Sequence, residues 1–150
     1  MNRNKNPLNV KQVSGSGWKG SVGADARGHA VFEDPAYGIR AAMRCFHSKY
    51  RNGKRTIKAI VFDWAPADDT EGSLPGGKPN DPEAYLRFVD VCVAWGKLDV
   101  LPDPVEDPVP WMWLLRAMAQ YEMGEPCPWV EVVVGMVYWF KDFVGEVEGG

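Results

Sequence analysis

Five segments of this chain repeat apolar residues at steps of three and four, a spacing that places side chains on one face of an α-helix. The first segment follows Asp34-Pro35, a capping residue and a proline suited to the first helical position, and ends at Asn52-Gly53. The same pair of residue types starts the third segment at Asp81-Pro82, and Gly96 ends it after Trp95. These two segments are therefore expected to be well-delimited amphipathic helices.

The other three segments are also bounded by helix start and stop signals. A short helix is expected from the cap Thr56 through Trp64, because Pro66 ends it. A fourth is expected at about residues 109–123 and a fifth at about residues 129–144. The tail, residues 145–150, is expected to fray and be flexible.

The N-terminal part shows a different pattern. Residues 1–17 are rich in Asn, Lys, Ser and Gly and are expected to be irregular, whereas residues 18–32 alternate glycines with single apolar residues. Turn chemistry at Asp25-Ala26-Arg27-Gly28 predicts a small β-ribbon that ends at Phe32. The predicted fold is therefore mainly α, or α+β, with about five helices and this ribbon in a single domain, residues 1–150.

The composition supports a globular chain. Of its 150 residues, 45% are hydrophobic, enough for a core, and the net charge of −3 does not indicate a nucleic-acid-binding protein. The start of the chain has no apolar run, so no secretion signal is expected, and Cys45, Cys92 and Cys127 lack metal-binding spacing and favour a reducing compartment. The longest apolar stretch, residues 128–144, contains three charged residues, so we expect no transmembrane span.

The basic residues are distributed unevenly. Most Lys and Arg precede Trp64, and Lys49 to Arg55 form a basic run, whereas the remainder of the chain is acidic. Such asymmetry can mark a surface for an anionic polymer such as nucleic acid, peptidoglycan or teichoic acid. The alternative interpretation is a solvated helix end and turn.

Short motifs in a fixed order provide the strongest functional clue. The chain reads Asn6-Pro7-Leu8-Asn9-Val10, then Gly17-Trp18-Lys19-Gly20, then Phe32-x-x-Pro35-x-x-Gly38-Ile39-Arg40-Ala41, then Trp64-Ala65-Pro66. This series resembles a family of small virion-associated structural proteins of bacteriophages and prophages, which read Asn-Pro-Gly-Asn-Ile, Trp-x-Gly, Phe-x-x-Pro-x-x-Gly-Ile-Arg-Ala and Trp-Ala-Pro. The chain departs from the pattern at Leu8, at Met123 and in the longer segment after Pro66.

The resemblance implies a phage or prophage origin and a place in the phage particle or the bacterial host cytoplasm. It also implies other virion proteins, or a second copy of the chain, as partners. It implies no specific chemistry.

Glu122 is the candidate catalytic residue. It ends an apolar helix just before Gly124, a local pattern similar to that around the acid of lytic transglycosylases and other lysozyme-like enzymes. An apolar environment raises the pKa of a carboxyl group, as a glycosidase acid requires. The alternative interpretation is a surface glutamate near a helix end.

A glycosidase needs a second carboxylate and a surface for sugar rings. The long loop after Pro66 offers Asp68, Asp69 and Glu71 as partners, with a solvated acidic loop as the alternative, whereas Asp63 is expected to hydrogen-bond locally. The aromatic side chains that could stack on sugars, and so bind substrate, are Trp64, Trp111, Trp113, Tyr121 and Trp129. Because Trp111 and Trp113 are two residues apart, both cannot face the same core.

No motif indicates a cofactor or a metal. His29 and His47 have no partner at metal-ligand spacing, and the N-terminal glycines lack the Lys-Ser/Thr of a phosphate-binding loop. Three functions stay open: a virion-associated structural or accessory protein that engages the cell wall, a lysozyme-like peptidoglycan hydrolase that uses Glu122, and a phage-encoded inhibitor of a host protein.

Overall fold

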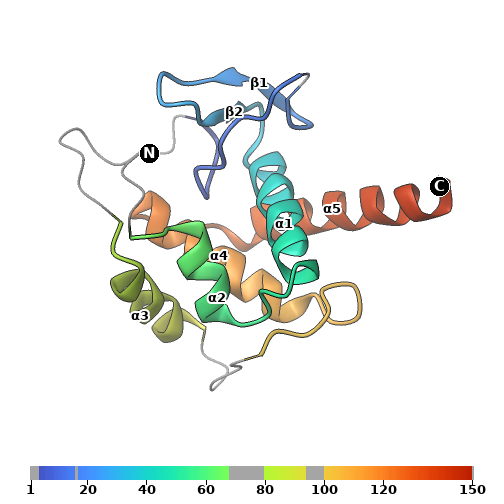
Figure 1. The fold of residues 1–150 in the computed structure, drawn as a ribbon. Helices are drawn as coiled ribbons and strands as arrows, with labels where there is room; N and C mark the ends of the chain where they lie inside the picture. Colours follow the sequence, from blue (N-terminus) through green and yellow to red (C-terminus); the bar gives the residue numbers. More distant parts are fainter. Residues whose placement is uncertain (1–3, 16, 68–79, 94–99, 150) are drawn as a thin grey trace.

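A computed structural model describes residues 4–15, 17–67, 80–93 and 100–149 of the chain. Within them lie two strands, β1 (Ser21–Ala24) and β2 (Ala30–Phe32), and five helices: α1 (Pro35–Arg51), α2 (Ile57–Trp64), α3 (Pro82–Cys92), α4 (Val109–Met123) and α5 (Trp129–Gly149). The prediction of a mainly helical α+β fold with five helices and an N-terminal ribbon is confirmed. Figure 1 shows the ribbon above one end of α1 and the helices gathered below it.

The ribbon is an antiparallel pair in which Gly23 faces Val31 and Ala24 faces Ala30. The predicted turn joins the strands, and the backbone N–H of Asp25 donates to the carbonyl of His29 at 2.8 Å. A second backbone contact, from Gln12 N–H to the Gly28 carbonyl at 2.8 Å, ties the irregular N-terminal segment to the same turn. The two strands and residues 10–12 therefore form one small unit.

The helix starts follow the predicted capping residues. The side chain of Asp34 accepts a hydrogen bond from Ala36 N–H, Thr56 accepts from Ala59 N–H, and Asp81 accepts from Ala84 N–H. Each bond satisfies one of the backbone donors that a helix leaves unpaired at its start. At the other end of α4, Gly124 takes a left-handed conformation with φ of 69°, which terminates the helix as its sequence predicts.

Two helix ends differ from expectation. The third helix ends at Cys92, because Val93 leaves the helical conformation with ψ of 86°, and Trp95 and Gly96 lie outside the described residues. The fifth helix continues past Val144 to Gly149. Gly145 lowers helix propensity, but no proline or left-handed residue follows to stop the helix.

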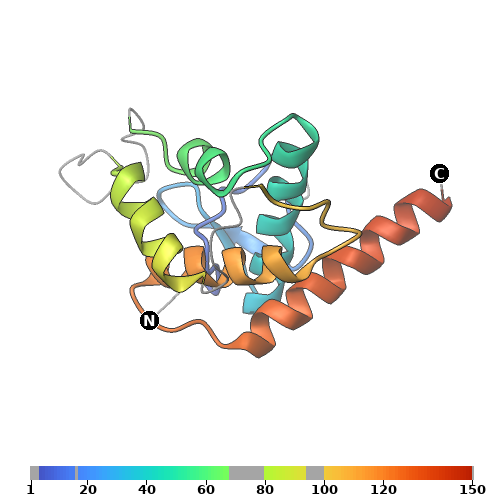
Figure 2. The same cartoon turned by 90° about the horizontal axis from the view of Figure 1, so that it is seen from below.

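α1 and α5 form the central helix pair. Ile39 of α1 is fully buried, and a Cβ added to Gly135 of α5 would lie 2.5 Å from its side chain, so the small glycine allows this close packing. Tyr37 and Tyr138 stack at a ring-centroid distance of 5.1 Å in the same interface. Figure 2 shows that the C-terminal part of α5 projects beyond the other helices.

The N-terminal segment is tied to the core by Asn6 and Gly38. The fully buried Asn6 side chain donates to the carbonyls of Val10 and Ala30 and accepts from Val10 N–H, each at 2.9 Å. A Cβ on Gly38 would lie 2.8 Å from Pro7, so only glycine allows this segment to cross α1 so closely. These contacts bring residues 8–13 over the helices.

Candidate functional site

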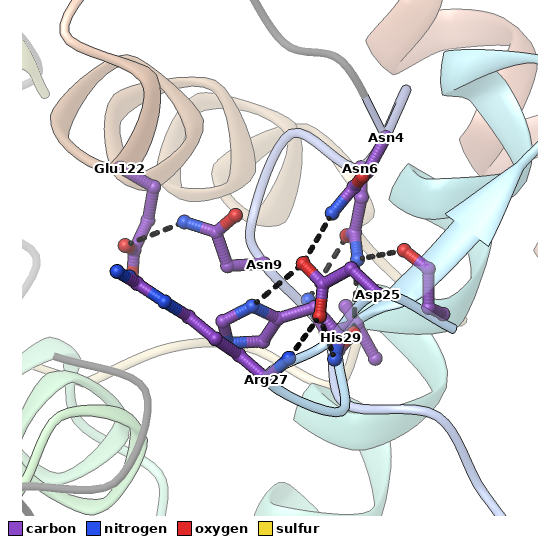
Figure 3. Close-up of polar contacts among 9 residues, drawn as sticks. Asn4, Asn6, Asn9, Asp25, Arg27, His29 and Glu122 are labelled. Carbon is purple, nitrogen blue, oxygen red and sulfur yellow. Dashed lines mark hydrogen bonds and ion pairs between the residues drawn. The ribbon is translucent and has the colours of Figure 1, made fainter. Parts of the chain in front are cut away.

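Glu122 lies in the last turn of α4, where three other parts of the chain meet it. Asn9 of the N-terminal segment donates a hydrogen bond to its carboxylate at 3.2 Å, and the hydroxyl of Tyr85 of α3 does so at 3.4 Å. Figure 3 shows the Asn9 amide and the Glu122 carboxylate pointing toward one another. Trp64, at the end of α2, also hydrogen-bonds to this carboxylate.

The pKa of Glu122 is raised above its ordinary value. Burial is the main cause, because it disfavours the charged carboxylate, and the hydrogen bonds from Asn9, Trp64 and Tyr85 offset it only in part. Glu122 is thus half-buried and hydrogen-bonded to side chains from other parts of the chain. Its environment favours a protonated carboxyl more than water does.

A cleft of about 450 Å³ opens beside this carboxyl group, and we call it the Glu122 cleft. Residues 8–13 form one wall and residues 63–66 form another, with Trp18 and Trp64 as its tryptophans. Further side chains that reach the cleft are His29, Cys45 and Asn80. The cleft therefore combines aromatic side chains with polar groups.

Asp63 is a second carboxylate in the lining of the Glu122 cleft. It forms ion pairs with Lys49 and, at 3.6 Å, with Lys54. The hydrogen bond from Lys49 is the main cause of a lowered pKa at Asp63; burial opposes it, and the charges of the two lysines add to it. Two carboxyl groups that line one cleft thus have pKa values shifted in opposite directions.

His29 occupies the cleft wall in a fixed orientation. Its Nδ1 lies 3.4 Å from Asp25 Oδ2, and its backbone N–H donates to Asp25 Oδ1 at 2.9 Å. Asp25 also accepts from the side chain of Asn4 at 2.8 Å and from the backbone N–H of Arg27 at 2.9 Å (Figure 3). The Asp25 carboxylate therefore holds the ribbon turn and the imidazole together.

The structure brings together only part of the predicted site. Trp64 lines the Glu122 cleft with Glu122, but Trp111 is fully buried in the core and donates its Nε1–H to the Pro102 carbonyl at 2.8 Å. Trp113 and Trp129 instead contact each other at 4.9 Å between ring centroids, away from the cleft lining. As expected from their spacing of two residues, Trp111 lies in the core, whereas Trp113 packs against Trp129.

Tyr121 belongs to a different contact. Its ring stacks on that of Tyr85 at 3.9 Å and is not part of the cleft lining. The three acidic candidates of the long loop, Asp68, Asp69 and Glu71, lie outside the described residues.

Sequence reasoning missed Asn9, Trp18 and Asp63 as cleft residues. Asn9 and Trp18 belong to two of the short sequence motifs, and Trp64-Ala65-Pro66 is a third, so several separate motifs line the same cleft. The motif positions were therefore an available signal. Asp63 had no such signal because its importance depends on the lysines that surround it.

Two further observations concern ligands and membranes. Among the described residues, no group of three or more His, Cys, Asp and Glu side chains is arranged to hold a metal ion. His47 packs instead against the rings of Trp139 and Phe143, at 5.3 Å and 5.2 Å. None of the helices in the described part of the chain has the length and apolar character needed to cross a membrane.

Comparison with known proteins identifies a phage relative. The chain is 36% identical over 93 residues to Protein P5 of Pseudoalteromonas phage PM2. This match takes in 58% of the chain and 51% of the phage protein, so the chain corresponds to about half the length of that relative. No protein-family model matches the chain.

Proposed function

We propose that this chain is a phage- or prophage-encoded protein that forms part of the virus particle and acts, through the Glu122 cleft, on the glycan strands of the bacterial cell wall. The observation that carries the proposal is the pair of carboxyl groups in one cleft, Glu122 with a raised pKa and Asp63 with a lowered one.

The phage origin is supported by the similarity to Protein P5 of phage PM2. The short motifs that resemble small virion-associated proteins agree with it. A place in the particle also requires a surface for contact with a neighbouring subunit, and α5 offers one.

The exposed face of α5 carries an apolar stripe of Val130, Val133, Val137 and Phe140, each between 43% and 66% exposed. Spaced over three turns, these side chains lie along one line of the helix. Their positions are symmetric about residue 135, so an antiparallel copy of the helix would place Val130 opposite Phe140 and Val133 opposite Val137. A two-fold contact needs this self-complementarity, and it favours a second copy of the chain as the occupant.

The chemistry proposed for the cleft is hydrolysis of a glycosidic bond. Glu122 donates its proton to the bridging oxygen as the bond from that oxygen to C1 breaks, and the ionised Asp63 stabilises the positive charge that develops at the sugar. A water molecule then adds to C1 and returns a proton to Glu122. Trp64 and Trp18 supply the faces on which sugar rings stack.

A structural role for Glu122 is the main alternative. Its carboxylate joins the N-terminal segment, α3 and α4, so it contributes to the fold whatever the chemistry of the cleft. A virion protein without activity, or an inhibitor that binds a host protein, would need only that role. An activity assay with matched variants separates these functions.

The assay is zymography on purified peptidoglycan. Wild type is expected to clear the substrate, whereas Glu122→Gln and Asp63→Asn are expected to lose clearing, and the exposed Glu83→Gln serves as the matched control. Thermal unfolding followed by circular dichroism shows that each variant is folded. A wild type that does not clear, or a folded Glu122→Gln variant that still does, contradicts the hydrolase.

The place in the particle has an independent test. Mass spectrometry of purified particles of the phage or induced prophage is expected to detect this chain in stoichiometric amounts. Its absence from the particles, together with its presence in the infected cell, would contradict a virion role and favour the inhibitor.

A further inference from the structure

A second cavity, of about 570 Å³, lies next to the Glu122 cleft. The two share Trp18, Cys45 and Asp63 in their linings, so they are neighbours across these side chains. We call this second space the basic cavity. Its other walls come from the C-terminal half of α1, the turn that follows it, and Trp139 and Phe143 of α5.

Cationic side chains are prominent in the lining of the basic cavity. Four cationic side chains line it, Arg44, Lys49, Arg51 and Lys54, against the single carboxylate of Asp63. The chain as a whole has a net charge of −3, so this concentration of positive charge runs against the overall composition. Lys49, Arg51 and Lys54 of the basic run noted in the sequence therefore line a cavity.

The positive charges of the basic cavity also affect His47, which forms part of its wall. The pKa of His47 is lowered mainly by burial and further by the positive charges of Arg51 and Arg44, against an opposing effect of Asp103. His47 therefore stays neutral at neutral pH and adds no charge. Asp63, the carboxylate in the lining, accepts from Lys49 and pairs with Lys54.

The shape and apolar surfaces indicate what kind of anion fits. Trp18 is half-buried, with its indole N–H held by the Lys11 carbonyl at 2.8 Å, and it forms part of both cavities. Phe143 is also half-buried and lines the basic cavity alone. Together with the cations, these rings would suit a polymer that alternates apolar sugar faces with negative groups.

We propose that the basic cavity binds the carboxylate groups of a glycan strand whose sugar rings continue past Trp18 into the Glu122 cleft. The inference rests on the proposed function and names the substrate as an anionic, not a neutral, glycan. It assigns Arg44, Lys49, Arg51 and Lys54 to substrate selection. Single-stranded nucleic acid also binds basic grooves with aromatic rings, so a thymidine oligonucleotide is the competing ligand in the test.

The test compares two glycans that differ in charge. Peptidoglycan strands freed of their peptides by an amidase carry a lactyl carboxylate on every second sugar, whereas chitin oligosaccharides of equal length are neutral. Binding to the Glu122→Gln protein, in which the proposed proton donor is absent, is measured by isothermal titration calorimetry. The carboxylated strand is expected to bind more tightly, and its advantage to shrink as salt is added.

Variants locate the effect. In the Glu122→Gln protein, the further substitutions Arg51→Gln and Lys54→Gln are expected to weaken binding of the carboxylated strand about tenfold. This is the loss expected for one or two charge-assisted contacts. Binding of the neutral oligosaccharide is expected to stay unchanged. Lys58→Gln with Lys141→Gln removes the same charge from exposed positions outside the cavity lining and serves as the control. An equal loss in the control would overturn the inference.

The outcomes distinguish the inference from the function on which it rests. If both glycans bind equally and a Trp64→Ala variant weakens both, the Glu122 cleft binds sugars and only the charge selection is refuted. If neither glycan binds, both proposals fall. Tighter binding of a thymidine oligonucleotide than of the carboxylated strand, lost in the Arg51 and Lys54 variant, would assign the basic cavity to nucleic acid instead.

Discussion

Asn9 and Glu122, separated by 113 positions in the sequence, are joined by a 3.2 Å hydrogen bond from the asparagine amide to the glutamate carboxylate. Asn9 has a positive φ of 54°, a conformation that asparagine tolerates better than most residues. The backbone conformation and the hydrogen bond thus favour the same residue type. This contact connects the N-terminal segment to the C-terminal end of α4 and forms one side of the Glu122 cleft.

The Asn9→Gly variant is expected to raise the pKa of Glu122 further. Glycine keeps the left-handed backbone but removes one of the hydrogen bonds that lower this pKa. The measurement is an NMR titration of the Glu122 carboxyl carbon. Gln12→Ala, which alters the same cleft without removing a hydrogen bond to Glu122, is the control. An unchanged pKa in Asn9→Gly would show that the contact does not persist in solution.

The raised pKa of Glu122 also predicts how stability depends on pH. A carboxyl group whose pKa is higher in the folded than in the unfolded protein stabilises the fold fully below the unfolded value, near 4.5, and this contribution is lost as pH rises through the folded value. Glu122→Gln removes this titration. Above pH 4.5, the free energy of unfolding of wild type should therefore fall relative to that of Glu122→Gln. Urea unfolding at a series of pH values measures the difference, and parallel curves would contradict the prediction.

Gly38→Ala is expected to destabilise the fold by about 1–3 kcal/mol, the usual cost of overpacking. The added Cβ would lie 2.8 Å from Pro7 and 3.1 Å from the backbone oxygen of Lys5. Gly145→Ala is the matched control, because nothing lies within 4 Å of that position and alanine has the higher helix propensity. Thermal unfolding of both variants checks this, and equal effects would refute the packing argument.

The ion pair between Arg40 and Asp142 anchors α5 to α1. Arg40 Nε lies 2.5 Å from Asp142 Oδ2, and the arginine side chain is 8% exposed. Asp142→Asn would leave a buried guanidinium uncompensated, so a loss of about 3 kcal/mol is expected. Lys19 pairs with the same carboxylate at 3.2 Å but is 55% exposed, so Lys19→Gln should cost about 1 kcal/mol or less. Chemical denaturation compares the two, and the reverse order would contradict the assignment.

The apolar stripe of α5 predicts self-association. Sedimentation velocity at increasing concentration is expected to show a dimer for wild type and a monomer for Val133→Glu with Val137→Glu, and circular dichroism is expected to show that the variant is folded. Val91→Glu, at an exposed valine of α3, is the control and should leave the dimer intact. A wild type that stays monomeric at all concentrations would contradict a two-fold contact through this stripe.

Much of the fold could be predicted because its signals are local. Asp34, Thr56 and Asp81 cap the helices that they were expected to start, and Gly124 ends α4. These signals depend on backbone groups a few residues away, so they are present in the sequence itself. The predicted end of α5 was wrong because it rested on Gly145, which lies inside the helix without a left-handed conformation. α3 ends at Cys92, before the predicted Trp95, because Val93 leaves the helical conformation.

The site was predictable only in part. Sequence pattern identified Glu122 and Trp64, but it also proposed Trp111, which the core buries completely. Composition cannot tell a tryptophan of the core from one in a cleft, because both lie on apolar helix faces. Asp63 was missed for the same kind of reason: its charge and pKa depend on Lys49 and Lys54, which only folding brings to it.

By itself, the sequence determined where the helices begin, which faces are apolar, and that one carboxyl group ends an apolar helix. Tertiary structure alone decided that Asn9, Trp64 and Tyr85 surround that carboxyl group, that Asp63 shares its cleft, and that the basic run lines a neighbouring cavity. The physical reason is the distance along the chain over which each interaction acts. Capping and periodicity act over a few residues, whereas the desolvation and charge that shift a pKa come from residues that are distant in the chain and adjacent only in the folded protein.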